Sequence, residues 1–225
     1  TQRLNLVTTE LQEGIMRTRM QPIGNIFNKV PRIIRDLSKK LSKEIELTVS
    51  GNDVEMDKTI LESLADPITH MIRNCCDHAI ETPDERVEMG KNKSGSISIR
   101  AYHDAGRIVI EIEDNGRGLN PIAIAANALK KGMHTELELA SMEDKEIQHL
   151  IMQPGFSTAS EVSDVSGRGV GMDVVKSSIE KLGGEIDFES KVGQGTKFIL
   201  SLPLTLAIIP CLIIKVDGER FAIPQ

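Results

Sequence analysis

The segment from Ile68 to Glu81 has two chemically different faces when it is arranged as a helix. At about 100° per residue, apolar residues gather on one face. They are Ile68, Met71, Ile72, Cys75 and Ala79, together with Leu64 one turn earlier. A stripe of this kind has to be buried against another layer of structure. The sequence therefore predicts a long helix, from about Asp57 to Ile80, that packs on a sheet.

The opposite face of this helix has an unusual composition. It carries His70, Arg73, Asn74, Asp77, His78 and Glu81. Asn and His are poor helix formers, so a plain solvated face would more often carry Lys and Glu. Asn, Asp and His are suited to holding a hydrated metal ion and phosphate oxygens. Taken alone, this face fits a wet surface helix and a ligand site equally well.

A glycine motif follows the second of two alternating segments. Residues Ser96 to Tyr102 and Arg107 to Glu113 predict a β-hairpin. The motif after it is Asp114-Asn115-Gly116-Arg117-Gly118-Leu119. A carboxylate at a strand end can accept hydrogen bonds in a pocket, and glycines let a ligand ring approach the backbone. Asp-Asn-Gly is also good turn chemistry, and on this motif alone a simple turn is favoured.

A second glycine motif, Ser166-Gly167-Arg168-Gly169-Val170-Gly171-Met172, precedes a predicted helix over 172–182. Glycines at a helix N-terminus present N–H groups and a positive dipole end to an anion. The preceding segment, Ser157 to Val165, is polar and not a buried strand, so a dinucleotide-binding fingerprint is excluded. The sequence also lacks GxxxxGK[ST], which excludes a P-loop enzyme.

The remaining segments complete the predicted order of elements. Helices are predicted over residues 1–21, from Pro22 to Leu41 and in short pieces over 121–154. Ile45, Leu47 and Val49 predict a strand, and Gly183-Gly184 predicts a C-cap. Further hairpins are expected at 185–189 with 196–202 and at 211–216 with 220–223, and a mobile segment at 155–171.

Composition excludes several classes of protein. Apolar residues make up 40% and charged residues 27%, as in a soluble globular protein. The net charge of -6 disfavours nucleic acid as a partner, because its phosphates select basic surfaces. The longest apolar run, from Leu202 to Ile214, is broken by prolines and is too short to cross a bilayer. Cys75, Cys76 and Cys211 form no metal-ligand pattern and are interpreted as buried thiols.

Taken together and in order, the motifs resemble those of the GHKL family, which includes gyrase B, Hsp90, histidine kinases and MutL. His70 to Glu81 resembles the N box, Asp114 to Gly118 the first G box, Phe156-Ser157-Thr158 the F box, Gly167 to Gly171 the second G box, and Gly195-Thr196-Lys197-Phe198 the GT motif. The N box and the phrases at 19–24, 166–175 and 202–207 are similar to those of CheA-type chemotaxis histidine kinases.

The resemblance implies an α/β fold, a two-layer GHKL (Bergerat) sandwich whose mixed β-sheet is covered by helices on one face. It also implies that ATP and Mg²⁺ are bound. His70, Arg73, Asn74 and His78 would form the catalytic group, with the metal at Asn74, His70 and His78. Asp114 would accept from the adenine amino group. The other nucleotide contacts would be Asp77, Gly116, Gly118, Ser157, Thr158, Gly167, Arg168, Gly169, Val170, Gly171 and Thr196, with an ATP lid between Asn127 and Ser166.

The resemblance also implies a function and a domain order. The γ-phosphoryl group would pass to a histidine on a separate phosphotransfer domain in chemotaxis signalling. Residues 1–21 would end a dimerisation helix, 22–203 would be the catalytic domain, and 204–225 would begin an adaptor-binding β domain. The full-length protein would be a cytoplasmic homodimer, associated with an adaptor protein and chemoreceptors at the inner face of the membrane without inserting into it.

One departure from the wider family bears on the reaction. Relatives that hydrolyse ATP carry a Glu four residues before the metal-binding Asn, and here that position is His70. This favours a site that holds ATP for transfer with little hydrolysis. Two alternatives stay open: an ATP-driven conformational machine like gyrase or Hsp90, and a nucleotide-sensing module without turnover.

Overall fold

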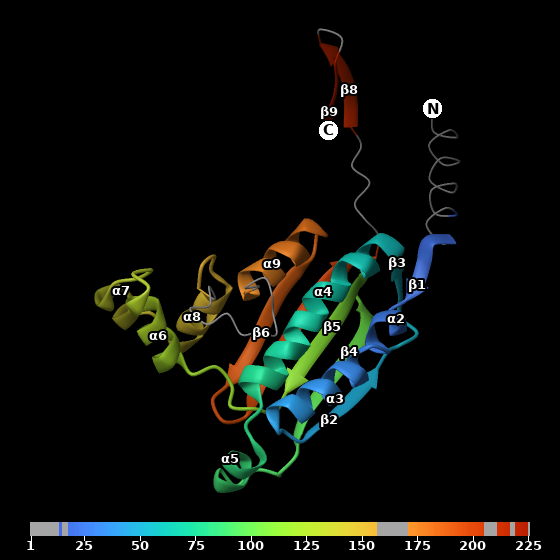
Figure 1. Cartoon of the computed structure of the whole chain (residues 1–225). Helices are drawn as coiled ribbons and strands as arrows, with labels where there is room; N and C mark the ends of the chain where they lie inside the picture. The colour runs from blue at the N-terminus through green and yellow to red at the C-terminus, as the bar shows by residue number, and fades with distance from the viewer. Residues whose placement is uncertain (1–13, 15–17, 157–170, 205–210, 217–218, 225) are drawn as a thin grey trace.

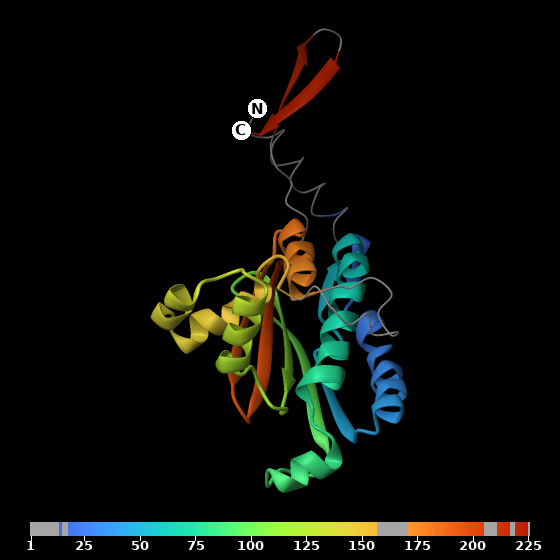
Figure 2. The same ribbon diagram turned by 60° about the vertical axis from the view of Figure 1, so that its left-hand side comes forward.

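Three helices lie side by side on one face of a five-stranded sheet in the computed structural model (Figures 1 and 2). They are α3 (Val30–Leu41), α4 (Lys58–Asn74) and α9 (Met172–Lys181). The structure describes residues 14, 18–156, 171–204, 211–216 and 219–224. The predicted helix-on-sheet arrangement is confirmed.

The sheet has the strand order β2-β4-β5-β7-β6. Its strands are β2 (Ile45–Ser50), β4 (Gly95–Asp104), β5 (Arg107–Asp114), β6 (Glu185–Lys191) and β7 (Gly195–Pro203). β2 and β4 are parallel, and the other neighbours are antiparallel. The predicted mixed sheet and both predicted hairpins are therefore confirmed. Residues Ala105 and Gly106, both with positive φ, make the tight turn between β4 and β5.

The apolar core of the sheet lies on the face beneath the helices, and the opposite face is largely polar apart from Val109. Ile108, Ile110 and Ile112 of β5 are fully buried beneath the helices. The other face carries polar side chains: Glu111 accepts from Lys197 Nζ at 2.7 Å and from Tyr102 Oη at 3.1 Å. The fold is therefore a two-layer sandwich, as the strand alternation predicts.

Helix α4 is the central helix of the covering layer. Asp57 caps its start by accepting from the Thr59 N–H at 2.7 Å. Besides Pro67, its buried side chains, each contributing about 1.5–3 kcal/mol, are Ile60, Leu61, Leu64, Ile68, Met71 and Ile72. After Asn74 the chain widens into a π-helical segment, η1 (Cys75–Ala79). Both Cys75 and Cys76 are buried there, which confirms their predicted environment; the side chain of Cys211 lies outside the described residues.

The N-terminal third differs from its prediction in two places. Met20–Pro22 is a strand, β1, paired with β3 (Glu55–Asp57), and not the end of a helix. Pro22 explains this, because a proline disfavours helical backbone at the residue before it. The helix predicted after Pro22 is divided into α2 (Gly24–Phe27) and α3, since Pro31 lacks the N–H that would continue the ladder. Most of the predicted helix over residues 1–21 lies outside the described residues.

Shorter elements surround this core. The predicted short helices are α6 (Pro121–Lys130), α7 (Glu136–Ser141), α8 (Asp144–His149) and η2 (Leu150–Met152). A further short helix, α5 (Pro83–Glu88), was not predicted. The predicted last hairpin is present as β8 (Cys211–Val216) and β9 (Glu219–Pro224). Gly183 closes α9 at φ 73°, as predicted. Within the described ranges, no helix has the length and apolar character needed to cross a membrane.

Candidate functional site

Asp114, the last residue of β5, is a buried carboxylate with one free oxygen. The residue is 3% exposed, and its Oδ1 accepts from the Gly116 N–H at 2.9 Å. Its Oδ2 makes no hydrogen bond of ordinary geometry to the described residues, although the Cys75 thiol and the Thr196 N–H are near enough to lower the pKa of the carboxyl. Burial raises the pKa of Asp114 to about 6, against the opposing effect of the Gly116 N–H. A buried acceptor without a partner costs free energy, so this oxygen is suited to a ligand donor.

The two glycines after Asp114 are required by the protein's own backbone. A Cβ at Gly116 would lie 2.1 Å from the Ala79 carbonyl oxygen. A Cβ at Gly118, which has φ 68°, would lie 2.3 Å from the Lys191 carbonyl oxygen. The Arg117 N–H also donates to Ala79 O at 2.9 Å. The turn therefore lies packed between η1 and the end of β6. This packing requires glycine at both positions, independently of any access for a ligand.

Thr196 lies opposite Asp114 at the edge of the site. The two residues are register partners between β5 and β7. Thr196 is 4% exposed, and its Oγ1 lies 2.8 Å from Ser190 Oγ on β6. Ser190 also accepts from the Leu119 N–H at 2.8 Å. This β6 residue was missed, because its polar contacts depend on strand pairing and leave no local sequence pattern.

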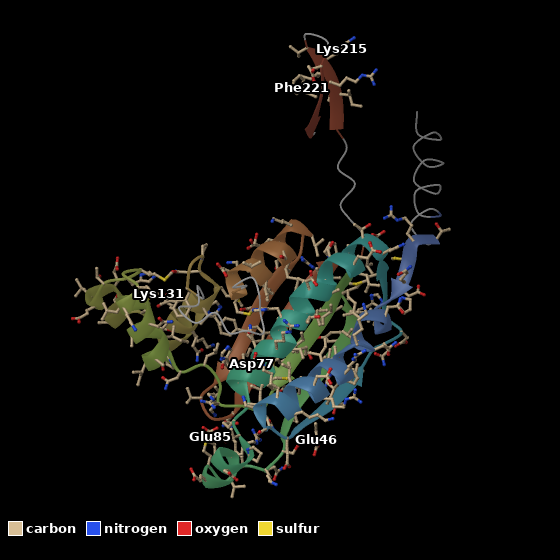
Figure 3. The ribbon with its side chains drawn as sticks, viewed as in Figure 1. Glu46, Asp77, Glu85, Lys131, Lys215 and Phe221 are labelled. Atoms are coloured by element: carbon tan, nitrogen blue, oxygen red, sulfur yellow. The ribbon has the colours of Figure 1, made fainter. Side chains whose placement is uncertain are left out.

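The polar face of α4 continues into η1, where Figure 3 labels Asp77 at the end of the helix. His70, Arg73 and Asn74 lie in the last turns of α4, and Asp77 and His78 lie in η1. Burial, and then the neighbouring Arg73 and His78 side chains, lower the pKa of His70. His70 is therefore neutral at pH 7, with a ring nitrogen able to accept. π-Helical segments occur often at functional sites, and this one carries two of the predicted residues.

Asn74 connects this face to α9. Its Nδ2 lies 3.4 Å from Met172 Sδ, at the first residue of α9. Gly171 is the N-cap of α9 and supplies no side-chain cap. The structure thus brings the N box and the last glycine of the second glycine motif together. Ser157, Thr158, Gly167, Arg168, Gly169 and Val170 lie outside the described residues, as do the end of the lid and all of the predicted mobile segment except residues 155, 156 and 171.

Glu81 does not belong to the open polar face, contrary to the helical projection. It is 1% exposed and forms ion pairs with Arg86 at 2.8 Å and Lys91 at 2.7 Å. The helix ends at Ala79, so a projection at 100° per residue no longer applies two residues later.

Lys43, which was also not predicted as part of the site, binds backbone carbonyl groups of η1. Its Nζ donates to Cys76 O at 2.6 Å and to Asp77 O at 2.8 Å. Burial lowers the pKa of Lys43, and the charge of Arg117 lowers it further. No sequence signal could have indicated this contact, since 33 residues separate donor and acceptor.

In the described part of the chain, no three His, Cys, Asp or Glu side chains lie close enough to hold a metal by themselves. Mg²⁺ is usually held by one or two protein groups together with phosphate oxygens and water. The side-chain oxygen of Asn74 fits such a shared site.

Comparison with known proteins identifies the fold family. The family model described as histidine kinase-, DNA gyrase B-, and HSP90-like ATPase matches residues 63–206. The chain therefore belongs to this ATPase family. It has the fold of the catalytic domain of histidine kinase ThkA, with a TM-score of 0.51 at 16% identity, covering 83% of this chain and 95% of that one.

Longer relatives confirm the predicted resemblance to CheA-type proteins. The chain is 51% identical over 221 residues to the sensor histidine kinase CheAY of Helicobacter pylori, covering 98% of this chain and 28% of that protein. It is 47% identical over 223 residues to the chemotaxis protein CheA of Bacillus subtilis, covering 99% of this chain and 33% of that protein. The chain thus spans a third or less of the length of these relatives.

Proposed function

We propose that this chain is the ATP-binding core of a CheA-type histidine kinase, which transfers the γ-phosphoryl group of ATP to a histidine on a separate phosphotransfer domain. The observation that carries the proposal is the free, buried Oδ2 of Asp114 at the end of β5. An adenine amino group is a donor of the kind this oxygen lacks. The ATPase family and the CheA relatives support the assignment.

The residues present fit ATP along one face of α4. Asp114 would accept from the base, with Gly116 and Gly118 shaping its turn and Thr196 beside it. The phosphates would lie toward the N-terminus of α9, where Gly171 leaves the first turn without a side-chain cap. Asp77 and the glycine-motif residues Gly167 and Gly169 would support them.

Mg²⁺ would be held by Asn74 together with the phosphates, and His70 and His78 would complete the metal site. When bound, the ion supplies neutralisation of the charge on the transferred group. The chain's own contribution is to orient: Arg73 adds positive charge, and neutral His70 offers an acceptor. Position 70 holds His in place of the Glu that activates water in ATP-hydrolysing relatives, which favours transfer over hydrolysis.

Domain boundaries and partners are part of the same proposal. Residues 20–203 would form the catalytic domain, because Met20 and Gln21 pair with β3. Residues 1–19 would end a dimerisation helix, and residues 204–225 would begin an adaptor-binding β domain. Among the described strands, β8 and β9 pair only with each other, and the exposed apolar side chains of this hairpin include Leu212, Ile213 and Phe221, which supports a separate unit. The full-length protein would be a cytoplasmic homodimer linked to chemoreceptors through an adaptor.

The test uses γ-labelled ATP, Mg²⁺ and this chain, with and without a separately made phosphotransfer domain. We expect label on the added domain with little free phosphate. Asp114→Asn should remove the transfer, whereas Asp104→Asn, on exposed Asp104 at the end of β4, should not. Rapid phosphate release without the acceptor would instead indicate an ATP-driven machine. Binding without either product would indicate a nucleotide-sensing module.

A further inference from the structure

Lys91, which belongs to none of the sequence motifs, hydrogen-bonds to the backbone of the turn after Asp114. Lys91 Nζ donates to the carbonyl oxygen of Gly116 at 2.7 Å and to that of Asn115 at 3.3 Å. The same nitrogen donates to Glu81 Oε1 at 2.7 Å. One ammonium group therefore joins two backbone oxygens of the turn to a buried carboxylate.

Glu81 and Arg86 make this anchor rigid. Arg86 Nη1 donates to Glu81 Oε2 at 2.8 Å and to Asn115 O at 3.2 Å, and Arg86 Nε donates to Asn92 O at 2.7 Å. Burial would raise the pKa of Glu81, but the hydrogen bond from Lys91 and the charges of Lys91 and Arg86 hold it below its usual value. Glu81 is therefore ionised at neutral pH, and the cluster is a satisfied buried network.

Gly116 links the Lys91–Glu81–Arg86 cluster to Asp114 through its two backbone polar groups. Its N–H donates to Asp114 Oδ1 at 2.9 Å, while its carbonyl oxygen accepts from Lys91 at 2.7 Å. Asp114 and Lys91 thus bind the two polar groups of one residue. With Oδ1 fixed by Gly116, the carboxylate has Oδ2 left for a ligand. A displacement of Gly116 would rotate that free oxygen.

We infer that Lys91, supported by Glu81 and Arg86, is a positioning residue for recognition of a base that carries an exocyclic amino group. It fixes the Asn115–Gly116 turn and thereby the direction of Asp114 Oδ2. This inference rests on the proposed function, in which Asp114 accepts from the adenine amino group. Lys93, two residues further on, pairs only at the surface, with Glu44 at 2.8 Å, and offers a matched control.

The experiment compares two nucleotides by calorimetric titration of this chain. ATP carries the 6-amino group, and purine riboside 5′-triphosphate lacks it but has the same sugar and phosphates. Lys91→Met is expected to reduce the preference for ATP about tenfold, with little effect on the amino-free analogue. Lys93→Met should leave the preference unchanged, and Lys91→Arg should restore most of it. Melting temperature is recorded for each variant.

The outcomes distinguish failure of the Lys91 positioning role from failure of the proposed base site at Asp114. Equal weakening of both nucleotides by Lys91→Met, or no change, would overturn the positioning role. If Lys91→Met does not fold, Lys91→Gln keeps a donor without the charge and is judged by the same preference. Asp114→Ala tests the base site itself: an unchanged ATP preference there would remove the proposed function and this inference together. If Asp114→Ala loses the ATP preference while Lys91→Met keeps it, only the positioning role of Lys91 is overturned.

Discussion

Gly118 and Lys191 approach so closely that no side chain fits between them: a Cβ on Gly118 would lie 2.3 Å from the Lys191 carbonyl oxygen. Gly118→Ala is therefore expected to lower the free energy of unfolding by roughly 3 kcal/mol, from left-handed strain plus displaced backbone. Gly132→Ala is the matched control, because Gly132 has a nearly equal φ of 66° and nothing within 4 Å of its added Cβ. It should cost about 1 kcal/mol. Urea unfolding of both variants measures the difference, and equal losses would contradict the contact.

Asp114 makes the stability of the nucleotide-free protein depend on pH. Its pKa of about 6 in the folded protein is above the ordinary value of 3.8, so the folded state binds its proton more tightly. The resulting stabilisation, about 3 kcal/mol, is present below about pH 4 and is lost as the pH rises through 6. Asp114→Asn removes this dependence, so without nucleotide the variant should be more stable than the parent at pH 7.5, by a margin that shrinks to about 1 kcal/mol at pH 4.5. Unfolding at both pH values tests this. A constant difference would refute the assignment.

Asn74→Asp should abolish Mg²⁺-dependent phosphoryl transfer. The substitution keeps the size of the side chain but adds a negative charge where phosphates are proposed to bind. Asn52 provides the control, since Asn52→Asp makes the same change at an exposed position between β2 and β3. Labelled transfer to an added phosphotransfer domain is the readout. Normal transfer by Asn74→Asp would exclude Asn74 as the metal ligand.

Lys43→Met should disturb the site without touching a proposed ligand residue. It removes two hydrogen bonds to the carbonyl oxygens of Cys76 and Asp77 and leaves them without a charged donor. We expect a loss of about 2–3 kcal/mol in the free energy of unfolding and weaker ATP binding. Exposed Lys40, at the end of α3, gives the control Lys40→Met. If the two variants behave alike, the Lys43 contacts are not important to η1.

Much of the fold could be predicted because its patterns are local. The alternation of Ile108, Ile110 and Ile112 and the stripe on α4 follow directly from strand and helix periodicity. The breaks at Pro22 and Pro31 were missed, although proline supplies the physical reason for both. The site was predicted as motifs, and the structure brings Asp114, Thr196, Asn74 and Gly171 to the positions described above.

What could not be predicted depends on contacts between distant segments. Lys43, Lys91 and Ser190 have no distinctive neighbours in sequence, and each gains its role from the backbone groups that folding places beside it. Glu81 was placed wrongly because the helix ends before it. The buried anchors behind a ligand site are therefore harder to infer than the residues that face the ligand.

Asp114 occupies the same side of β5 as Ile108, Ile110 and Ile112, so the carboxylate is the final member of an apolar row. A residue inserted within β5 would exchange the two faces and turn Glu113 inward in its place. An insertion at Ala105–Gly106, in the exposed turn, would leave the row intact. The β4–β5 turn at Ala105–Gly106 can therefore gain residues during evolution. The number of residues from Ile108 to Asp114 cannot change, because both the buried apolar row and the position of the Asp114 carboxylate depend on it.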